Sequence, residues 1–136
     1  DGSSEKEVLR KGIRVLLAED NLVNQNVASA LLIKAGCLVD TVDNGRDAAL
    51  EIRKKEYDVV LMDCEMPIMD GFESTKKIRA LREPYCKIPI IALTANAMKD
   101  DYKKCMDAGM NDYISKPISR DRLIKLINRH TVNAQH

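Results

Sequence analysis

Residues 58–70 read DVVLMDCEMPIMD, an apolar run that ends in a carboxylate and continues into a proline-containing loop. The run from Asp58 to Met62 is short and almost entirely aliphatic, which is typical of a strand covered on both faces. Asp70 stands three residues before Glu73, a pattern that caps the start of a helix. This stretch therefore predicts a buried strand, a loop and a following helix.

The same order of strand and helix recurs on both sides of this stretch, with a turn or cap residue at nearly every junction. The predicted strands are residues 13–18, 38–42, 58–62, 88–93 and 112–115. The predicted helices are 22–35, a helix opened by Asn44-Gly45, one capped by Asp70, one capped by Asn96 and ended by Gly109, and one capped by Ser119. Five such repeats with right-handed crossovers predict an α/β fold, a parallel five-stranded sheet between two layers of helices.

Repeating apolar residues support two of these helices. In the first helix, the repeat recurs every three or four residues, at Val23, Val27, Ala30, Leu31 and Lys34. In the fourth, the residues expected on one side are Met98, Tyr102, Cys105 and Met106. The methionine and cysteine residues of this helix are interpreted as core and not as metal ligands.

Composition and charge fit one ordinary globular domain. The chain has 136 residues, of which 45% are hydrophobic and 32% charged, too apolar for a disordered tail. Lys and Arg total 22 against 21 Asp and Glu, so the formal net charge of +1 attracts neither nucleic acid nor an anionic membrane. No apolar run approaches the roughly 20 residues of a membrane helix, and residues 1–12 lack the apolar core of a secretory signal. We expect a cytoplasmic domain.

The four cysteines, at positions 37, 64, 86 and 105, form no Cys-x-x-Cys pair, and the two histidines stand at 130 and 136. This spacing suits neither a zinc cluster nor a disulfide framework. The favoured interpretation is that the cysteines are reduced side chains in or near the core.

Polar side chains stand where the predicted strands end: Glu19, Asp20, Asp63, Thr94 and Lys116. Parallel sheets bind ligands outside the carboxyl ends of their strands, at the point where the strand order reverses. Each side chain alone has an ordinary explanation as a cap, a loop residue or a surface charge, but four separate segments supply them. Three carboxylates at one rim should raise at least one pKa unless Lys116 or a bound cation compensates.

The residues at this rim offer only oxygen ligands, which suits Mg²⁺ or Mn²⁺ better than zinc. Neither a G-x-x-x-x-G-K-[ST] nor a G-x-G-x-x-G motif occurs, which argues against a nucleotide-binding enzyme. An aspartate that holds a phosphoryl group covalently needs no such cradle.

Four motifs together resemble the receiver domain of two-component response regulators: LAEDN at 17–21, VLMDCEMPIMDG at 60–71, IALTA at 91–95 and DYISKP at 112–117. Each motif alone is weak, but the combination is specific and covers the chain from about residue 13 to 129. The resemblance implies a flavodoxin-like (βα)5 three-layer sandwich with strand order 2-1-3-4-5. That order places the first and third strands at the reversal, where the carboxylates stand.

The resemblance also implies a role for each residue at the rim. Asp63 would be the nucleophile that accepts a phosphoryl group from a phosphohistidine. Asp20 and Asp63 would bind Mg²⁺, or Mn²⁺, through their side chains, Glu65 through its main-chain carbonyl and Glu19 through water. The domain would thereby catalyse its own phosphorylation and dephosphorylation.

The remaining implied roles concern binding of the phosphoryl group and the switch that follows. Lys116 would pair with one phosphoryl oxygen, while the Thr94 hydroxyl and the Ala95 N–H would bind others. Tyr113 would rotate into the space that Thr94 leaves, and the Lys116-Pro117 bond would be cis. Readout, and a weak dimer, are expected on the face made by the fourth helix, fifth strand and fifth helix.

Within the family, the motifs resemble receivers fused to the C-terminus of hybrid sensor histidine kinases, whose full-length parent can be membrane-anchored. We expect residues 1–12 to be a linker, 13–130 the receiver and 131–136 a tail. The expected partners are a histidine kinase and a histidine-phosphotransfer helix bundle, the latter docking near Asn24 and Val27.

Three alternatives stay open from the sequence. The first is a stand-alone single-domain response regulator. The second is a Mg²⁺-dependent phosphohydrolase with an aspartyl-phosphate intermediate, whose usual Asp-x-Asp would need a second acid where Glu65 stands. The third is a docking module that is not phosphorylated, which would normally lack part of the acidic set that is complete here.

Overall fold

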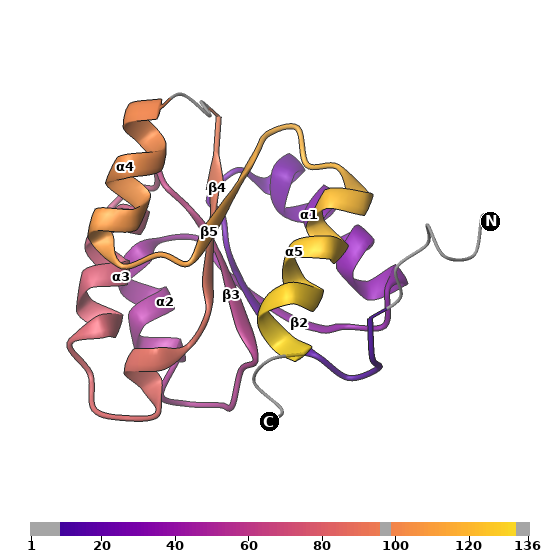
Figure 1. The fold of residues 1–136 in the computed structure, drawn as a ribbon, viewed down its shortest axis with the longest axis horizontal. Coiled ribbons are helices and arrows are strands. Elements are labelled where there is room, and N and C mark those ends of the chain that lie inside the picture. The colour runs from indigo at the N-terminus through magenta and orange to yellow at the C-terminus, as the bar shows by residue number, and fades with distance from the viewer. Residues whose placement is uncertain (1–8, 96–98, 133–136) are drawn as a thin grey trace.

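The computed structural model describes residues 9–95 and 99–132, without the side chains at 99, 100 and 132. Strands and helices alternate throughout these ranges (Figure 1). The elements are β1 (Arg14–Ala18), α1 (Leu22–Lys34), β2 (Leu38–Val42), α2 (Gly45–Glu51), β3 (Val59–Asp63), α3 (Gly71–Arg79), the short 3-10 helix η1 (Tyr85–Lys87), β4 (Ile90–Thr94), α4 (Lys99–Ala108), β5 (Asp112–Ser115) and α5 (Arg120–Val132). The predicted α/β alternation is confirmed.

The five strands form one parallel sheet in the order β2-β1-β3-β4-β5, so the flavodoxin-like topology is confirmed. Helices α1 and α5 cover one face of this sheet, and α2, α3 and α4 cover the other (Figure 1). The neighbouring strands β1 and β3 lie at the point where the strand order reverses. Their carboxyl ends are therefore where a ligand site is expected.

Two hydrophobic clusters form the core, one on each face of the sheet. In β1, Leu17 belongs to the cluster under α1 and α5, whereas Leu16 belongs to the cluster under α2, α3 and α4. Both side chains are fully buried. Because the central strands are covered on both sides, their sequences are continuous apolar runs instead of alternating patterns.

Capping side chains start the helices where the sequence predicted. Asp70 Oδ1 accepts a hydrogen bond from the N–H of Glu73 at 2.9 Å, and Asn44 Oδ1 accepts one from Asp47 at 2.8 Å. Ser119 Oγ accepts a longer bond, 3.4 Å, from the N–H of Arg122. The predicted cap Asn96 lies outside the described residues. The caps at Asn44 and Asp70 each satisfy a backbone N–H group in the first turn of α2 and α3.

Two strands are displaced by one or two residues from their predicted ranges. β4 begins at Ile90, not at residue 88, because Pro89 has no N–H for a sheet ladder. β3 begins one residue after Asp58, whose carboxylate instead accepts a hydrogen bond from the N–H of Arg14 at 2.8 Å. Each strand also ends one residue later than predicted, at Thr94 and Asp63, so the sheet itself anchors both residues at the rim.

The apolar repeat of α1 lies only partly on its buried face. Val23 and Val27 are 69% and 50% exposed, whereas Ala28 and Leu32, outside the repeat, are fully buried. Leu31 of the repeat packs against the core.

In α4, Cys105 is fully buried and Met106 packs against the core, so their predicted core role is confirmed. Tyr102 is 46% exposed, and the predicted Met98 lies outside the described residues.

The hydrophobic core includes a residue that precedes the predicted domain boundary at residue 13. Leu9 is buried and belongs to the core cluster under α1 and α5. Arg10 forms an ion pair with Asp58 at 3.4 Å. At the other end Thr131 is buried and donates to the carbonyl of Ile127.

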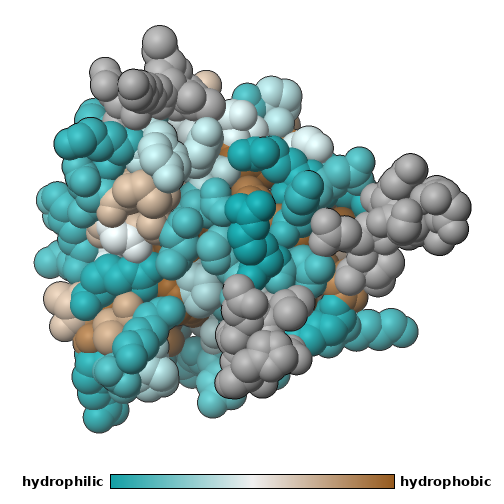
Figure 2. All heavy atoms as spheres, viewed as in Figure 1, coloured by the Kyte–Doolittle hydropathy of each residue, from teal (hydrophilic) through white to brown (hydrophobic). Residues whose placement is uncertain are grey.

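The face seen in Figure 2 is mainly hydrophilic and is interrupted by small hydrophobic patches. Within residues 9–95 and 99–132, no helix has both the length and the apolar character that crossing a membrane requires.

Candidate functional site

One cleft at the carboxyl ends of β1, β3 and β4 contains every predicted site residue except Tyr113. The predicted residues that line it are Glu19, Asp20, Asp63, Glu65, Thr94, Ala95 and Lys116. They come from the carboxyl ends of four strands, β1, β3, β4 and β5. The convergence expected from the parallel sheet is therefore present in the structure.

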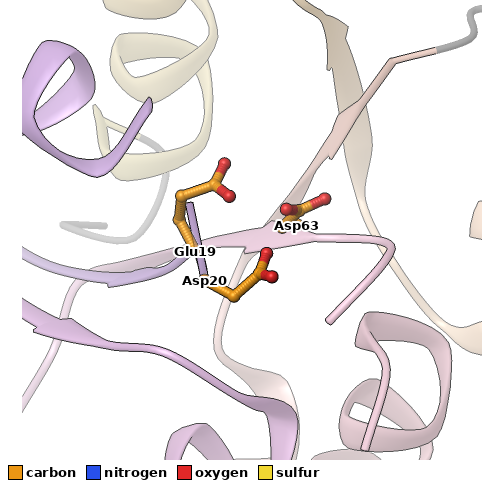
Figure 3. Close-up of side chains that lie close together, drawn as sticks. All are labelled: Glu19, Asp20 and Asp63. Atoms are coloured by element: carbon orange, nitrogen blue, oxygen red, sulfur yellow. The ribbon is translucent and has the colours of Figure 1, made fainter. Parts of the chain in front are cut away.

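Three carboxylates form the acidic part of this cleft. Glu19 and Asp20 follow β1, Asp63 ends β3, and their side chains point into the same space (Figure 3). One carboxylate oxygen from each lies within 4.8 Å of the others. Glu19 and Asp63 are 1% and 4% exposed, whereas Asp20 is exposed. This cluster combines strong mutual repulsion with poor solvation of two of its members.

Lys116 compensates part of this negative charge. Its Nζ lies 3.1 Å from Asp63 Oδ2 and 3.1 Å from Glu19 Oε1. Burial opposes the charged ammonium, but the two carboxylates outweigh it and raise the pKa of Lys116. The Lys116-Pro117 peptide bond is cis, as the resemblance implied.

Glu19 shows the unbalanced charge of the cluster most clearly. Burial, and next its contact with Asp63, raise the pKa of Glu19 from 4.5 to about 7, although the N–H of Asn21 donates to its Oε2 at 3.1 Å. Its Oε1 is buried and pairs with Lys116 Nζ at 3.1 Å, but this ammonium is shared with Asp63. The expectation that at least one rim carboxylate has a raised pKa is confirmed.

The cluster fits a divalent cation that prefers oxygen ligands. Three carboxylates face one ammonium group, whose single charge is shared between Glu19 Oε1 and Asp63 Oδ2. Mg²⁺ and Mn²⁺ bind such oxygen sets and keep several waters. Asp20 is the exposed member, so this side of the cluster is open to solvent.

The β3–α3 loop and the end of β4 supply polar groups around Asp63. The N–H of Glu65 donates to Asp63 Oδ1 at 3.1 Å, while the residue itself is exposed. Thr94 is 5% exposed, and its carbonyl accepts the N–H of Lys116 at 2.8 Å. Ala95 is exposed at the mouth of the cleft. Asp63 thus has one oxygen held by a main-chain N–H and the other by an ammonium.

Tyr113 lies outside the cleft, in β5. Its ring packs edge-on against Tyr102 of α4, with 5.3 Å between centroids and 66° between planes. From α5, the guanidinium carbon of Arg122 lies 5.9 Å from the ring centroid. The tyrosine therefore connects α4, β5 and α5.

The residues of the cleft that were not predicted from the sequence include two charged side chains of α4. Asp101 and Lys104 line it from α4. Their spacing of three places them on one side of a helix, which is the available signal. That signal does not say which side of α4 faces the rim, because this depends on how the helix packs.

Gly71 explains how closely α3 can begin beside the site. Its N–H donates to the carbonyl of Cys64 at 3.0 Å. A Cβ atom at Gly71 would collide with the carbonyl oxygen of Asp63. Asp70 therefore caps α3, and Gly71 lets the start of this helix approach the backbone of Asp63 closely.

Sequence comparison assigns the chain to one family and finds relatives that are much longer than this chain. Residues 15–128 match the model of the response regulator receiver domain. Hybrid signal transduction histidine kinase L of Dictyostelium discoideum is 41% identical over 128 residues, which cover 90% of this chain. The matched region is 8% of that kinase, so this chain spans a small part of its relative.

Solved structures agree with the sequence comparison. The receiver domain of sensor histidine kinase PA1611 from Pseudomonas aeruginosa PAO1, with a magnesium ion coordinated in its active site cleft, has a TM-score of 0.83 at 44% identity. The match covers 89% of this chain and 98% of that one. The Saccharomyces cerevisiae complex of the histidine phosphotransfer protein Ypd1 with the receiver domain of Ssk1 gives 0.84 at 28% identity, covering 93% of each chain.

Proposed function

Because this chain belongs to the response regulator receiver domain family, we propose that it is the phosphoacceptor of a two-component phosphorelay, in which Asp63 takes a phosphoryl group from a phosphohistidine. The observation that carries the proposal is the environment of Asp63. This buried carboxylate ends β3 beside Glu19 and Asp20, with Lys116 Nζ 3.1 Å from one oxygen and the Glu65 N–H 3.1 Å from the other.

In the proposed reaction an oxygen of the Asp63 carboxylate attacks phosphorus while the bond between phosphorus and the histidine nitrogen breaks. Lys116 pairs with a phosphoryl oxygen and with the remaining carboxylate oxygen. The Thr94 hydroxyl and the Ala95 N–H donate to the other phosphoryl oxygens. These donors stand on strand ends, so the sheet holds them in position before the donor protein arrives.

The acidic cluster has a second task in this proposal. Asp20 and Asp63 would hold Mg²⁺, or Mn²⁺, through their side chains, Glu65 through its main-chain carbonyl and Glu19 through water. When bound, the ion neutralises oxygens of the transferring group in a loose, in-line transition state. The three clustered carboxylates around one ammonium group, together with the raised pKa of Glu19, support an additional cation at this position.

Phosphorylation would act as a switch through the end of β4. A phosphoryl group adds roughly −1.5 to −2 charge and three acceptor oxygens, which would draw the Thr94 hydroxyl inward. Tyr113 would follow, changing its contacts with Tyr102 and Arg122. Readout, and any weak self-association, would then use the surface of α4, β5 and α5.

The proposed partner surface is the exposed apolar part of the first two turns of α1, beside the cleft. Leu22, Val23 and Val27 are 66%, 69% and 50% exposed, and Asn24 of the same helix lines the cleft. A histidine-phosphotransfer helix bundle could cover these side chains while presenting its histidine to Asp63. The structural likeness to the Ssk1 receiver complex with Ypd1 supports this kind of partner.

The likeness to a hybrid kinase supports an origin of this domain in such a protein, with a histidine kinase as a second partner. We place the receiver at residues 13–130, with Leu9 and Thr131 as additional buried contributors to its core. Residues 1–12 would then serve mainly as a linker.

The test is incubation with Mg²⁺ and acetyl phosphate, followed by intact mass and acid lability. We expect one acid-labile phosphoryl adduct that disappears in Asp63→Asn. A matched variant, Asp70→Asn, keeps a capping side chain outside the cluster and should retain the adduct. An adduct that survives in Asp63→Asn, or none in the wild type, would refute the proposal.

A further inference from the structure

Two cysteines lie close together, one beside the site and the other in α4. Cys64 follows Asp63 directly, and Cys105 lies in α4, 41 residues along the chain. Their Sγ atoms are 4.0 Å apart, and both thiols are free. A disulfide is about 2.05 Å long, so an approach of about 2 Å would join them.

The two thiols differ in access to solvent. Cys64 is 6% exposed and lines the cleft, whereas Cys105 is fully buried. A small oxidant that enters the cleft would therefore meet Cys64 first and find Cys105 directly behind it. Buried thiols react slowly, so the reaction requires sustained exposure to the oxidant.

We propose that hydrogen peroxide converts Cys64 and Cys105 into a disulfide that ties α4 to the end of β3 and slows phosphoryl transfer to Asp63. The peroxide transfers one oxygen to the sulfur of Cys64, giving a sulfenic acid and one water. The sulfur of Cys105 then attacks the sulfur of Cys64 and the S–O bond breaks. The departing hydroxide takes the Cys105 proton as a second water, so two thiols lose two electrons to one peroxide.

The effect on the site follows from the neighbours of the two cysteines. Moving Cys64 toward α4 shifts the backbone that links Asp63 to Glu65. The N–H of Glu65 donates to Asp63 Oδ1 at 3.1 Å, so this shift would change the position of the carboxylate. Lys104, adjacent to Cys105, lines the same cleft, so a shift of α4 also changes the wall of the cleft. Small displacements of reacting groups reduce the reaction rate strongly, so the disulfide should slow phosphoryl transfer.

The disulfide itself does not depend on the proposed function, whereas its effect on transfer rests on Asp63 being the phosphoacceptor. The experiment therefore has two readouts. The reduced protein is treated with hydrogen peroxide, and non-reducing peptide mapping locates any cross-link. Labelling by acetyl phosphate with Mg²⁺ is measured before oxidation, after oxidation and after treatment with dithiothreitol.

We expect a peptide linking Cys64 to Cys105 and the loss of the mass of two hydrogen atoms. The rate of labelling should fall by at least about tenfold and return on reduction. Cys105→Ala should abolish both effects. Cys86→Ala should abolish neither, since Cys86 is a half-buried thiol in η1, before the amino end of β4, whereas Cys64 follows the carboxyl end of β3.

A map without this cross-link, or one that joins Cys86 instead, would refute the disulfide. A cross-linked protein that is labelled at the reduced rate would refute the regulatory effect. If the reduced protein is not labelled at all, the proposed function and the regulatory effect fail together, while the map still decides the disulfide. The wild-type map is informative even if a cysteine variant fails to fold.

Discussion

The ammonium of Lys116 lies 3.1 Å from Asp63 Oδ2, so a residue that follows β5 contacts the last residue of β3 across the intervening strand β4. The same ammonium lies 3.1 Å from Glu19, beside β1. One cation thus contacts carboxylates at the ends of two other strands. Its single charge leaves part of the negative charge uncompensated, and this imbalance governs the first two predictions.

Removing the charge of Asp63 should not weaken the metal-free fold. Asp63→Asn relieves repulsion with Glu19 and Asp20, and Lys116 keeps Glu19 as its partner. We expect the melting temperature without divalent ions to be unchanged or higher, and the rise on adding Mg²⁺ to be smaller. Thermal melts with and without Mg²⁺, with Glu73→Gln as control, measure both effects. A marked loss of stability without metal would contradict the argument from repulsion.

Glu19 should make the metal-free domain less stable as pH rises. The pKa of Glu19 is about 7 in the folded chain and 4.5 ordinarily, so the folded state binds its proton more tightly. This stabilising contribution is complete below pH 4.5 and is lost as pH rises through about 7. Relative to Glu19→Gln, the wild type should therefore lose free energy of unfolding across that range. Urea denaturation in chelator measures it, and a pH-independent difference would contradict it.

The exposed part of α1 should affect transfer from a protein donor and not from a small one. Val27→Lys places a charge on the proposed docking surface, where an apolar contact is worth more than about 1 kcal/mol, so transfer from a phosphorylated histidine-phosphotransfer protein should slow about tenfold. Labelling by acetyl phosphate should be unchanged. Ile33→Lys, on the same helix and 61% exposed, is the matched control. Equal effects of both variants on transfer would contradict the proposed docking surface on α1.

Arg79 should be a major contributor to stability although it contacts no carboxylate in the described residues. Its guanidinium donates to the carbonyls of Gly109, Cys86 and Ile88 and to Asn111 Oδ1, at 2.7 to 2.9 Å. Arg79→Ala would remove the guanidinium donor from the three carbonyls, while Asn111 Oδ1 would keep the N–H of Ile90. This loss should lower the free energy of unfolding by about 3 kcal/mol or more. Urea denaturation measures this loss, with the exposed neighbour substitution Lys77→Ala as control. Similar small losses in both variants would contradict it.

Leu9 should contribute to folding although it precedes β1. Its side chain is 3% exposed within the core cluster under α1 and α5. Leu9→Ala should lower the free energy of unfolding by about 2 kcal/mol or more, the lower range for truncating a buried leucine. Chemical denaturation would detect this change, and Leu50→Ala, at a 43% exposed position, is the control. Stability equal to that of the control would place Leu9 outside the cooperative core.

Local patterns were sufficient for the order of elements and for the list of rim residues. Buried parallel strands need continuous apolar runs, and the run before Asp63 is one. Caps act within three residues, so Asp70 could be assigned from the sequence. The exposed side of α1 could not be identified, because Val27 and Leu32 are both apolar and only packing distinguishes them.

The sequence by itself determined the alternation of strands and helices, and therefore which carboxylates stand at strand ends, because these features depend on neighbouring residues. Only the tertiary structure decided which groups meet. The contacts of Lys116 with Asp63, of Arg79 with Gly109 and of Cys64 with Cys105 join residues 53, 30 and 41 positions apart. Such contacts depend on strand order, helix packing and side-chain direction together, and none of these is a local property of the chain.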